Sequence, residues 1–302
     1  MEIFKRPTEI DFMGKRGTAL IFSVVLILAG LISVVMHGGL KFGIDFSGGT
    51  LIQLQFKTPP DIDNIRDGLK TIGLGDSTIQ EFGSKQDILI RVQRSEEKLE
   101  EVGSQVKNSL KDKFNLEDIT VERVEMVGPK VGRDLREKAV LSILYSLVGI
   151  VIYISWRFEF QYAIAAIIAL VHDVLVTMGA FSVADKEFTL VIVAAFLTII
   201  GYSLNDTIVI FDRIRENMRR RGKTPLLELI NVSINQTLSR TLLTSGTTLL
   251  VVMALFFLGG AIIHDFSFAL MIGVFIGTYS SVFIASVFLV YWETKFKAHK
   301  KA

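Results

Sequence analysis

The stretch LTIIGYSLNDTIVIFDRIREN, residues 197–217, decides the fold class, because it places a carboxylate inside a membrane helix. About 20 apolar residues suffice to cross the hydrocarbon core of a bilayer, and the apolar run 188–211 is long enough to do so. This run nevertheless contains Asn205 and Asp206. A charged side chain at the centre of a bilayer costs about 2.5–3.5 kcal/mol on insertion scales, so it faces protein or a wet cavity and marks a functional site by default. Asp206 is therefore the first candidate for a functional residue.

The composition predicts a polytopic membrane protein with a soluble part. Of the 302 residues, 50% are hydrophobic, and the mean hydropathy is +0.46. The net charge of +2 gives no support for a nucleic-acid partner, and the absence of cysteine excludes disulfides and thiol chemistry. We find no nucleotide, metal or nucleophile constellation, so we expect no cofactor and no enzymatic activity.

Six apolar runs predict six transmembrane helices, with a soluble insert after the first. The first run, 17–36, follows a polar N-terminus, 1–16. It is longer than the apolar core of a cleavable signal peptide, so we expect it to remain as a membrane span. The insert covers 38–137, and a five-helix bundle follows over 139–292. The bundle spans are expected at 139–156, 162–183, 188–211, 238–260 and 268–292, with a basic loop at 212–235 and a tail at 293–302. Within that loop, 226–235 is expected to form a surface or interfacial helix.

The basic residues indicate how the chain sits in the membrane. Lysine and arginine gather in 1–16, in the loop at Arg157, in 212–223 and in the tail. Short loops rich in Lys and Arg stay in the cytoplasm. We therefore expect both termini on the cytoplasmic side of the membrane, and residues 38–137 outside the cytoplasm. The Arg-rich segment 212–223 could also contact anionic membrane lipid or a ribosome, but its role in setting the topology is enough to explain its charge.

The insert is predicted to have a ferredoxin-like α+β fold. Its opening, GLKFGIDFSGGT at 39–50, is rich in glycine and has no helical pattern. Strands are expected at 50–56, 77–82, 87–93 and 119–127, with helices from Asp61 to about Ile72 and, capped by Ser95, from Glu96 to about Phe114. The order β-α-β-β-α-β is that of the ferredoxin-like arrangement. That fold hosts many functions and supports no activity by itself.

A second set of polar residues lies in the fifth span, at a depth similar to that of Asp206. It contains Arg240 and a stripe of hydroxyl side chains that includes Thr237, Thr241 and Thr244. We predict that Asp206 and Arg240 face one cavity, in which the carboxyl group can change its protonation state as helices move. The alternative is a static buried pair that fixes the helix register.

Four further polar residues could support this site. Asn205 precedes Asp206, and Tyr202 lies one turn before it on the same face of the helix. Asp173 lies near the middle of the third span, and its neighbour His172 could relay protons. The alternative for Asp173 and His172 is an anchor that holds the third span to its neighbours by hydrogen bonds.

Several motifs, in the same order along the chain, resemble one family. They are GIDFSGGT (43–50), VGPKVGRDL (127–135), WRFEFQYAIAAIIALVHDV (156–174), GYSLNDTIVIFDRIREN (201–217), SINQTLSRTLLTS (233–245) and GTYSSVFIA (277–285). Together they resemble SecF, the smaller half of the SecDF protein-export complex in the resistance-nodulation-division superfamily. The resemblance covers nearly the whole chain.

The resemblance implies a function and partners that the residues alone do not. A SecF-like chain would pair with SecD and assist the Sec channel, SecYEG, and its accessory membrane subunits. It would act on a preprotein outside the membrane and use the proton motive force. In this family the aspartate that matches Asp206 is the proton-linked residue, and the arginine that matches Arg240 is its basic partner.

Three other functions stay open from the sequence. The first is one half of a proton-driven exporter of small molecules or lipids from the same superfamily. The second is a membrane scaffold that only stabilises a partner. The third, an intramembrane hydrolase, would need Asp173 and Asp206 as a catalytic pair, and the chain lacks the GxGD signature of such proteases.

Overall fold

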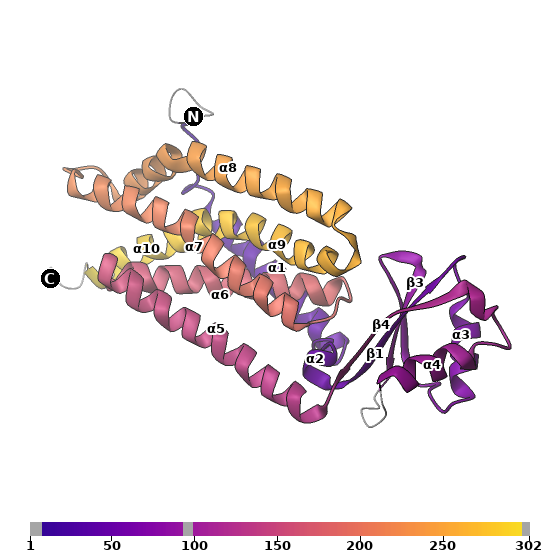
Figure 1. Ribbon diagram of the computed structural model, residues 1–302. Coiled ribbons are helices and arrows are strands. Elements are labelled where there is room, and N and C mark those ends of the chain that lie inside the picture. The colour runs from indigo at the N-terminus through magenta and orange to yellow at the C-terminus, as the bar shows by residue number, and fades with distance from the viewer. Residues whose placement is uncertain (1–7, 93–98, 298–302) are drawn as a thin grey trace.

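The chain forms a helical bundle with a small α/β domain at one end (Figure 1). The structure is a computed structural model that describes residues 8–92 and 99–297. Among these residues, six helical segments are long and apolar enough to cross a membrane, as predicted. They are α1 (Arg16–Met36), α5 (Pro129–Arg157), α6 (Phe160–Val183), α7 (Leu190–Arg219), α8 (Leu226–Leu258) and Ile263–Lys295.

The last span is a composite of regular and widened helix. It contains α9 (Gly260–Ser280), the π-helical η2 (Ser281–Ala285), α10 (Ser286–Trp292) and the π-helical η3 (Glu293–Lys297). Hydrophobicity does not signal a π-helix, and the sequence analysis did not predict one.

Three helices extend further than their apolar runs. α5 begins at Pro129, with the proline in its first turn, where the missing N–H is tolerated. α7 continues to Arg219, and α8 begins at Leu226, so most of the basic segment 212–235 is helix. A helix satisfies its own backbone hydrogen bonds. A helix can therefore continue beyond the apolar zone of the membrane. Hydropathy shows the extent of the apolar zone and does not show where the helix ends.

The small domain has an antiparallel sheet of four strands. The strands are β1 (Gly49–Phe56), β2 (Thr78–Phe82), β3 (Ser84–Val92) and β4 (Ile119–Val127), in the spatial order β2-β3-β1-β4. Between them lie α3 (Ile62–Lys70) and α4 (Leu99–Ser109). Ile52 and Ile90 from the sheet pack with Ile65 of α3 and Val106 of α4 in a core with no exposed area.

The glycine-rich opening of the insert contains a helix, contrary to the sequence analysis. A short helix, α2 (Ile44–Ser47), lies between two glycines. Gly48, with φ of 74°, then turns the chain into β1, which is a conformation that glycine adopts without strain. The helix is too short for a periodic pattern to show it. The expected cap Ser95 lies outside the described residues.

Glycines bring the spans of the bundle into close contact. A Cβ added at Gly273 of α9 would lie 2.3 Å from the Ile199 side chain of α7, and one at Gly277 would lie 2.9 Å from the Cβ of Ser203. Gly30 of α1 faces Gly179 of α6 in the same way, with 2.6 Å between the added Cβ and the Gly179 Cα. Small residues therefore let these backbones approach each other, as in many membrane bundles.

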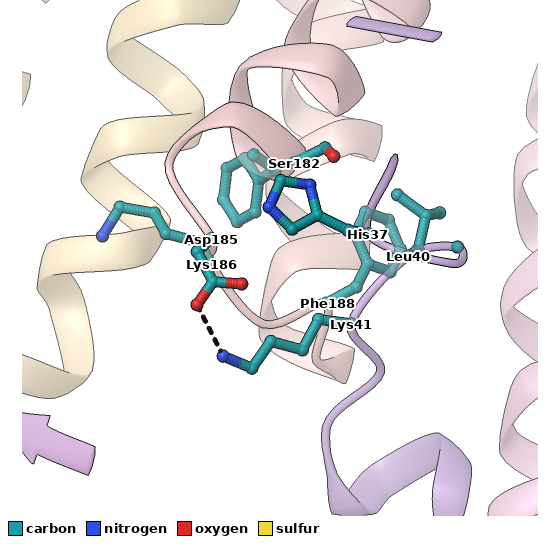
Figure 2. Close-up of a pocket in the computed structure, with 9 residues that line it drawn as sticks. His37, Leu40, Lys41, Ser182, Asp185, Lys186 and Phe188 are labelled. Carbon is teal, nitrogen blue, oxygen red and sulfur yellow. Dashed lines mark hydrogen bonds and ion pairs between the residues drawn. The ribbon is translucent and has the colours of Figure 1, made fainter. Parts of the chain in front are cut away.

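The small domain is fastened to the turn between α6 and α7. Phe188 in this turn exchanges backbone hydrogen bonds with the segment that follows α1, donating to Lys41 at 2.7 Å and accepting from Gly43 at 2.9 Å. Lys41 also forms an ion pair with Asp185 at 2.9 Å (Figure 2). These contacts hold the chain that enters the domain against the bundle.

A second set of contacts crosses a cleft of ≈ 730 Å³ between the sheet and the bundle. Arg91 of β3 forms an ion pair with Glu187 of the α6–α7 turn, and both side chains are about 15% exposed. On the bundle side of this cleft, Lys186 of the same turn pairs with Asp265 of α9 at 2.5 Å. We refer to this end of the bundle as the domain side.

The opposite end of the bundle carries the first described residues and the end of the last span (Figure 1). Here residues 8–14, which we name the N-terminal strap, lie across α8. Asn235 accepts hydrogen bonds from the Thr8 hydroxyl at 2.6 Å and the Ile10 amide at 2.9 Å. Asn231 accepts from the Phe12 amide at 2.8 Å. These amide side chains explain why the first turns of α8 stay attached to the bundle.

Candidate functional site

Asp206 lies in the interior of the bundle, where it is 2% exposed. Three hydroxyl groups from two neighbouring helices donate to its carboxylate. Ser245 of α8 is 2.9 Å from Oδ2, Thr278 of α9 is 3.4 Å from the same oxygen, and Thr244 of α8 is 3.4 Å from Oδ1. The predicted membrane carboxylate is thus enclosed by neutral donors.

Each of these hydroxyls has a second acceptor within reach. Thr278 lies 3.0 Å from the carbonyl of Val274, and Thr244 lies 3.0 Å from that of Thr241. The Ser245 and Thr278 hydroxyls are 2.7 Å apart. A hydroxyl rotates to suit its partner. The donors can therefore turn away when the carboxyl group gains a proton, and none is left unsatisfied.

Arg240 interacts electrostatically with Asp206 but makes no direct ion pair with it. Its side chain is exposed, and the ion pairs of the described residues include none between the two. Around α8, Arg240 lies roughly 140° from Ser245, which bonds to Asp206 Oδ2, but only about 40° from Thr244, which bonds to Oδ1. The buried face of α8 carries Thr237, Thr241 and Ser245 instead.

The other predicted residues of this region divide between the interior and the surface. Asn205 is exposed, like Arg240. Thr237 is buried and bonds to carbonyls of its own helix. The hydroxyls of Tyr202 and Thr241 are buried, and no described residue is within hydrogen-bond reach of either. The interior around Asp206 therefore holds polar atoms with free hydrogen-bonding capacity.

Asp173 and His172 contact each other in a second buried group. Asp173 of α6 is fully buried, and its Oδ1 is 3.0 Å from His172 Nδ1. Its Oδ2 accepts hydrogen bonds from Ser203 of α7 at 2.6 Å and from Ser280 of α9 at 2.8 Å. The imidazole ring stacks on Tyr279 with 6.1 Å between ring centres.

The sequence analysis missed the donors that α7 and α9 supply. Ser203, Thr278 and Ser280 were not singled out, although GTYSS at 277–281 is a run of hydroxyl residues inside an apolar span. That run is the signal that could have identified two of them. No group of three or more His, Asp or Glu side chains in residues 8–92 and 99–297 could hold a metal ion.

Fold and site together define a multi-pass membrane protein with six spans and carboxylates buried between them. Comparison with known proteins narrows this class. Residues 105–295 match the family described as protein export membrane protein SecD/SecF, C-terminal, and residues 35–60 match the SecD/SecF GG motif. The chain belongs to the SecF family.

Individual relatives agree with this assignment. The protein translocase subunit SecF of Desulfurispirillum indicum is 50% identical over 293 residues, which is 95% of this chain and 93% of the relative. SecF of Vibrio alginolyticus is 46% identical over 94% of this chain and 90% of its own length.

Two solved structures have the same fold. The crystal structure of SecDF, a translocon-associated membrane protein from Thermus thermophilus, matches with a TM-score of 0.87 and 35% identity over 98% of this chain. SecDF in a super-membrane-facing form matches with a TM-score of 0.71 and 35% identity over 99% of this chain. This chain spans 40% of the first SecDF chain and 41% of the second.

Proposed function

We propose that the chain is the SecF-type subunit of a SecDF complex, which promotes Sec-dependent protein translocation across the inner membrane by using the proton motive force. In this proposal the chain is a transport subunit and not an enzyme. Asp206 is the proton-linked residue. The observation that carries the proposal is its placement inside the bundle, surrounded by hydroxyl donors that have alternative acceptors.

The partner we propose is SecD, and an uncovered polar face supports it. Asn205 of α7 and Arg240 and Thr247 of α8 are exposed although they lie in membrane-spanning helices. Lipid is a poor environment for such side chains, so a protein partner is expected to cover them. Arg240 would then reach the carboxyl group of Asp206, or one from SecD, after assembly or during movement.

The energy available from protons is adequate for a conformational switch. One elementary charge that crosses 100 mV yields about 2.3 kcal/mol. A protonation change at Asp206 could bias two arrangements of the helices by a similar amount. We propose that the six spans of this chain move against those of SecD, as related halves do in many transporters.

We further propose a ferredoxin-like fold and an extracytoplasmic position for the small domain. The element order β-α-β-β-α-β and the antiparallel sheet support the fold, and the basic residues at the opposite end of the bundle support the position. The domain would act on a preprotein that leaves SecYEG, and the basic segments would contact membrane lipid. No cofactor and no nucleic acid are part of the proposal.

The test is preprotein export in vesicles that contain SecYEG, SecD and either wild-type chain or Asp206→Asn. We expect the variant to assemble with SecD and to lose the part of export that depends on an imposed proton gradient. Asp212→Asn is the matched control, because Asp212 is an exposed carboxylate on the same helix; it should retain the gradient response. A full gradient response in Asp206→Asn would show that Asp206 is structural. If export with the wild-type chain is equal with and without the imposed proton gradient, the result favours a scaffold.

A further inference from the structure

The second buried carboxylate, Asp173, has an environment that a purely structural anchor does not require. His172 binds it through Nδ1, while the Nε2 of the same ring is buried without a partner among the described residues. The ring itself is 5% exposed. A neutral imidazole has one donor and one acceptor nitrogen. The His172–Asp173 pair therefore has one unoccupied position that can bind a proton, next to the carboxylate.

Asp173 and Asp206 are connected through one turn of α9. Thr278 donates to Asp206, and two residues later Ser280 donates to Asp173. The next residue, Ser281, is 2.7 Å from the Thr207 hydroxyl, and Thr207 directly follows Asp206. The same turn of one helix therefore contacts both carboxylates, which lie on two other helices.

Helix α7 supplies a second connection. Ser203 donates to Asp173 at 2.6 Å and lies three residues before Asp206, close to one turn of the helix. Gly277 allows α9 to approach Ser203, since a Cβ at that position would lie 2.9 Å from the Ser203 Cβ. The two carboxylates are thus held by backbone segments that are packed against each other.

The connecting turn ends where α9 becomes π-helical, at Ser281–Ala285. Such single-turn widenings inside α-helices occur frequently at functional sites. Ser280 also has an alternative acceptor in the Gly277 carbonyl at 3.1 Å. It can therefore release Asp173 and remain hydrogen-bonded, as Thr278 can release Asp206.

We propose that Asp173 and His172 form a second proton-binding site, which the turn Thr278–Ser281 couples to Asp206. A proton at either carboxylate changes the hydrogen bonds that this turn makes and so changes the proton affinity of the other. The proposal deepens the proposed function and rests on Asp206 being proton-linked. The existence of the Asp173 site itself does not depend on it.

Few other titratable groups face Asp173. From its own helix there is His172, and Tyr279 of α9 stacks on the His172 ring. The partners that α7 and α9 supply to the carboxylate itself, Ser203 and Ser280, are neutral hydroxyls. The span of α1 from Gly17 to Met36 has no titratable side chain. The apolar part of α5 and the helix α10 bring only exposed tyrosines, Tyr145, Tyr153 and Tyr291.

The experiment is infrared difference spectroscopy of the complex of the full chain with SecD in lipid vesicles, as the pH is changed. We expect two carboxylic-acid bands, one lost in Asp173→Asn and the other in Asp206→Asn. Coupling between sites is reciprocal. The Asp206 band in Asp173→Asn and the Asp173 band in Asp206→Asn should therefore shift their titration midpoints by the same amount. We expect a shift that corresponds to roughly a fivefold or larger change in proton affinity.

Two further variants separate coupling from folding. Ser280→Ala keeps both carboxylates and should reduce the coupling between the titration midpoints of Asp173 and Asp206. Ser267→Ala should leave this coupling unchanged. Ser267 is a suitable control because it lies on the same helix, is fully buried and has no hydrogen-bond partner among the described residues.

The outcomes distinguish this proposal from the proposed function. If only the band lost in Asp206→Asn titrates, Asp173 is an anchor and the second site does not exist. If only the band lost in Asp173→Asn titrates, the second site stands and the role of Asp206 fails. If Asp173→Asn does not assemble, His172→Gln must change the Asp173 band for the proposal to stand.

Discussion

The crossing of α1 and α6 at Gly30 and Gly179 allows the most quantitative prediction. In Gly30→Ala, the new Cβ would lie 2.6 Å from the Gly179 Cα, whereas carbon atoms prefer roughly 3.5–4.0 Å. The opposing atom is backbone, so the helices must separate by about 1 Å. Overpacking of this kind destabilises by about 1–3 kcal/mol, while exchange of glycine for alanine within a helix contributes about 1 kcal/mol in the other direction. We expect a net loss of up to about 2 kcal/mol.

The assay is denaturant unfolding of the purified full chain in detergent, with Gly149→Ala as the matched control. Nothing lies within 4 Å of a Cβ added at Gly149, so that variant should be unchanged or more stable by up to about 1 kcal/mol. A second readout uses the absence of native cysteine. Ser33 and Ser182 are hydrogen-bonded across the same crossing at 2.9 Å, and a disulfide between cysteines placed there should form more slowly with Gly30→Ala. Equal stability of the two alanine variants would refute the close approach of α1 and α6.

Two further predictions concern the ends of the bundle, and a third concerns the small domain. Glu187→Ala removes the partner of Arg91 and should broaden the distance distribution between spin labels on β3 and on the α6–α7 turn; an unchanged distribution would show that this ion pair does not fasten the domain. Asn235→Ala removes two acceptor bonds from the N-terminal strap, each worth about 1 kcal/mol, so a protease should cleave the strap faster than in wild type, and an equal rate would contradict its role. A hydrogen bond from Lys70 holds the pKa of Asp67 below its ordinary value. The bond therefore stabilises the small domain at pH values above the ordinary aspartate pKa, and this stabilisation is lost as the pH falls through the lowered pKa. NMR titration should show a higher Asp67 midpoint in Lys70→Met, and no change would exclude the bond.

The spans were predictable from the sequence, while several of their ends were not. Each apolar run longer than about 20 residues predicts a span, and β4 at 119–127 has the predicted bounds. A helix was predicted at 226–235, but its continuity with the fifth span was not. The polar extension of α7 to Arg219 has no such signal. Its helical state depends on contacts with other parts of the chain, such as the hydrogen bonds from Asn217 to Ser233 and Gln236.

The candidate site was predictable only in part, for a related reason. Asp206 and Asp173 stand out because a carboxylate is rare in an apolar run. The hydroxyl stripe of the fifth span also stands out, but the sequence does not show which of its members bonds to its own helix backbone, as Thr247 does here, and which bonds to a carboxylate. Whether Ser245 or Thr244 approaches the carboxylate more closely depends on the rotation of α8 against α7. A linear sequence does not contain that rotation.

The same rotation has a consequence for the assembly. It places the buried hydroxyls of α8 toward Asp206 and leaves Arg240 on the uncovered side, together with Asn205 of α7. An arginine that remains in contact with lipid is unfavourable by about 2.5–3.5 kcal/mol on insertion scales, and this penalty disappears when a partner with a polar or acidic surface covers it. This chain spans 40% of the SecDF chain that it matches. In the proposed complex the hydroxyl donors of Asp206 therefore come from this chain, while the surface that completes the environment of Arg240 comes from SecD.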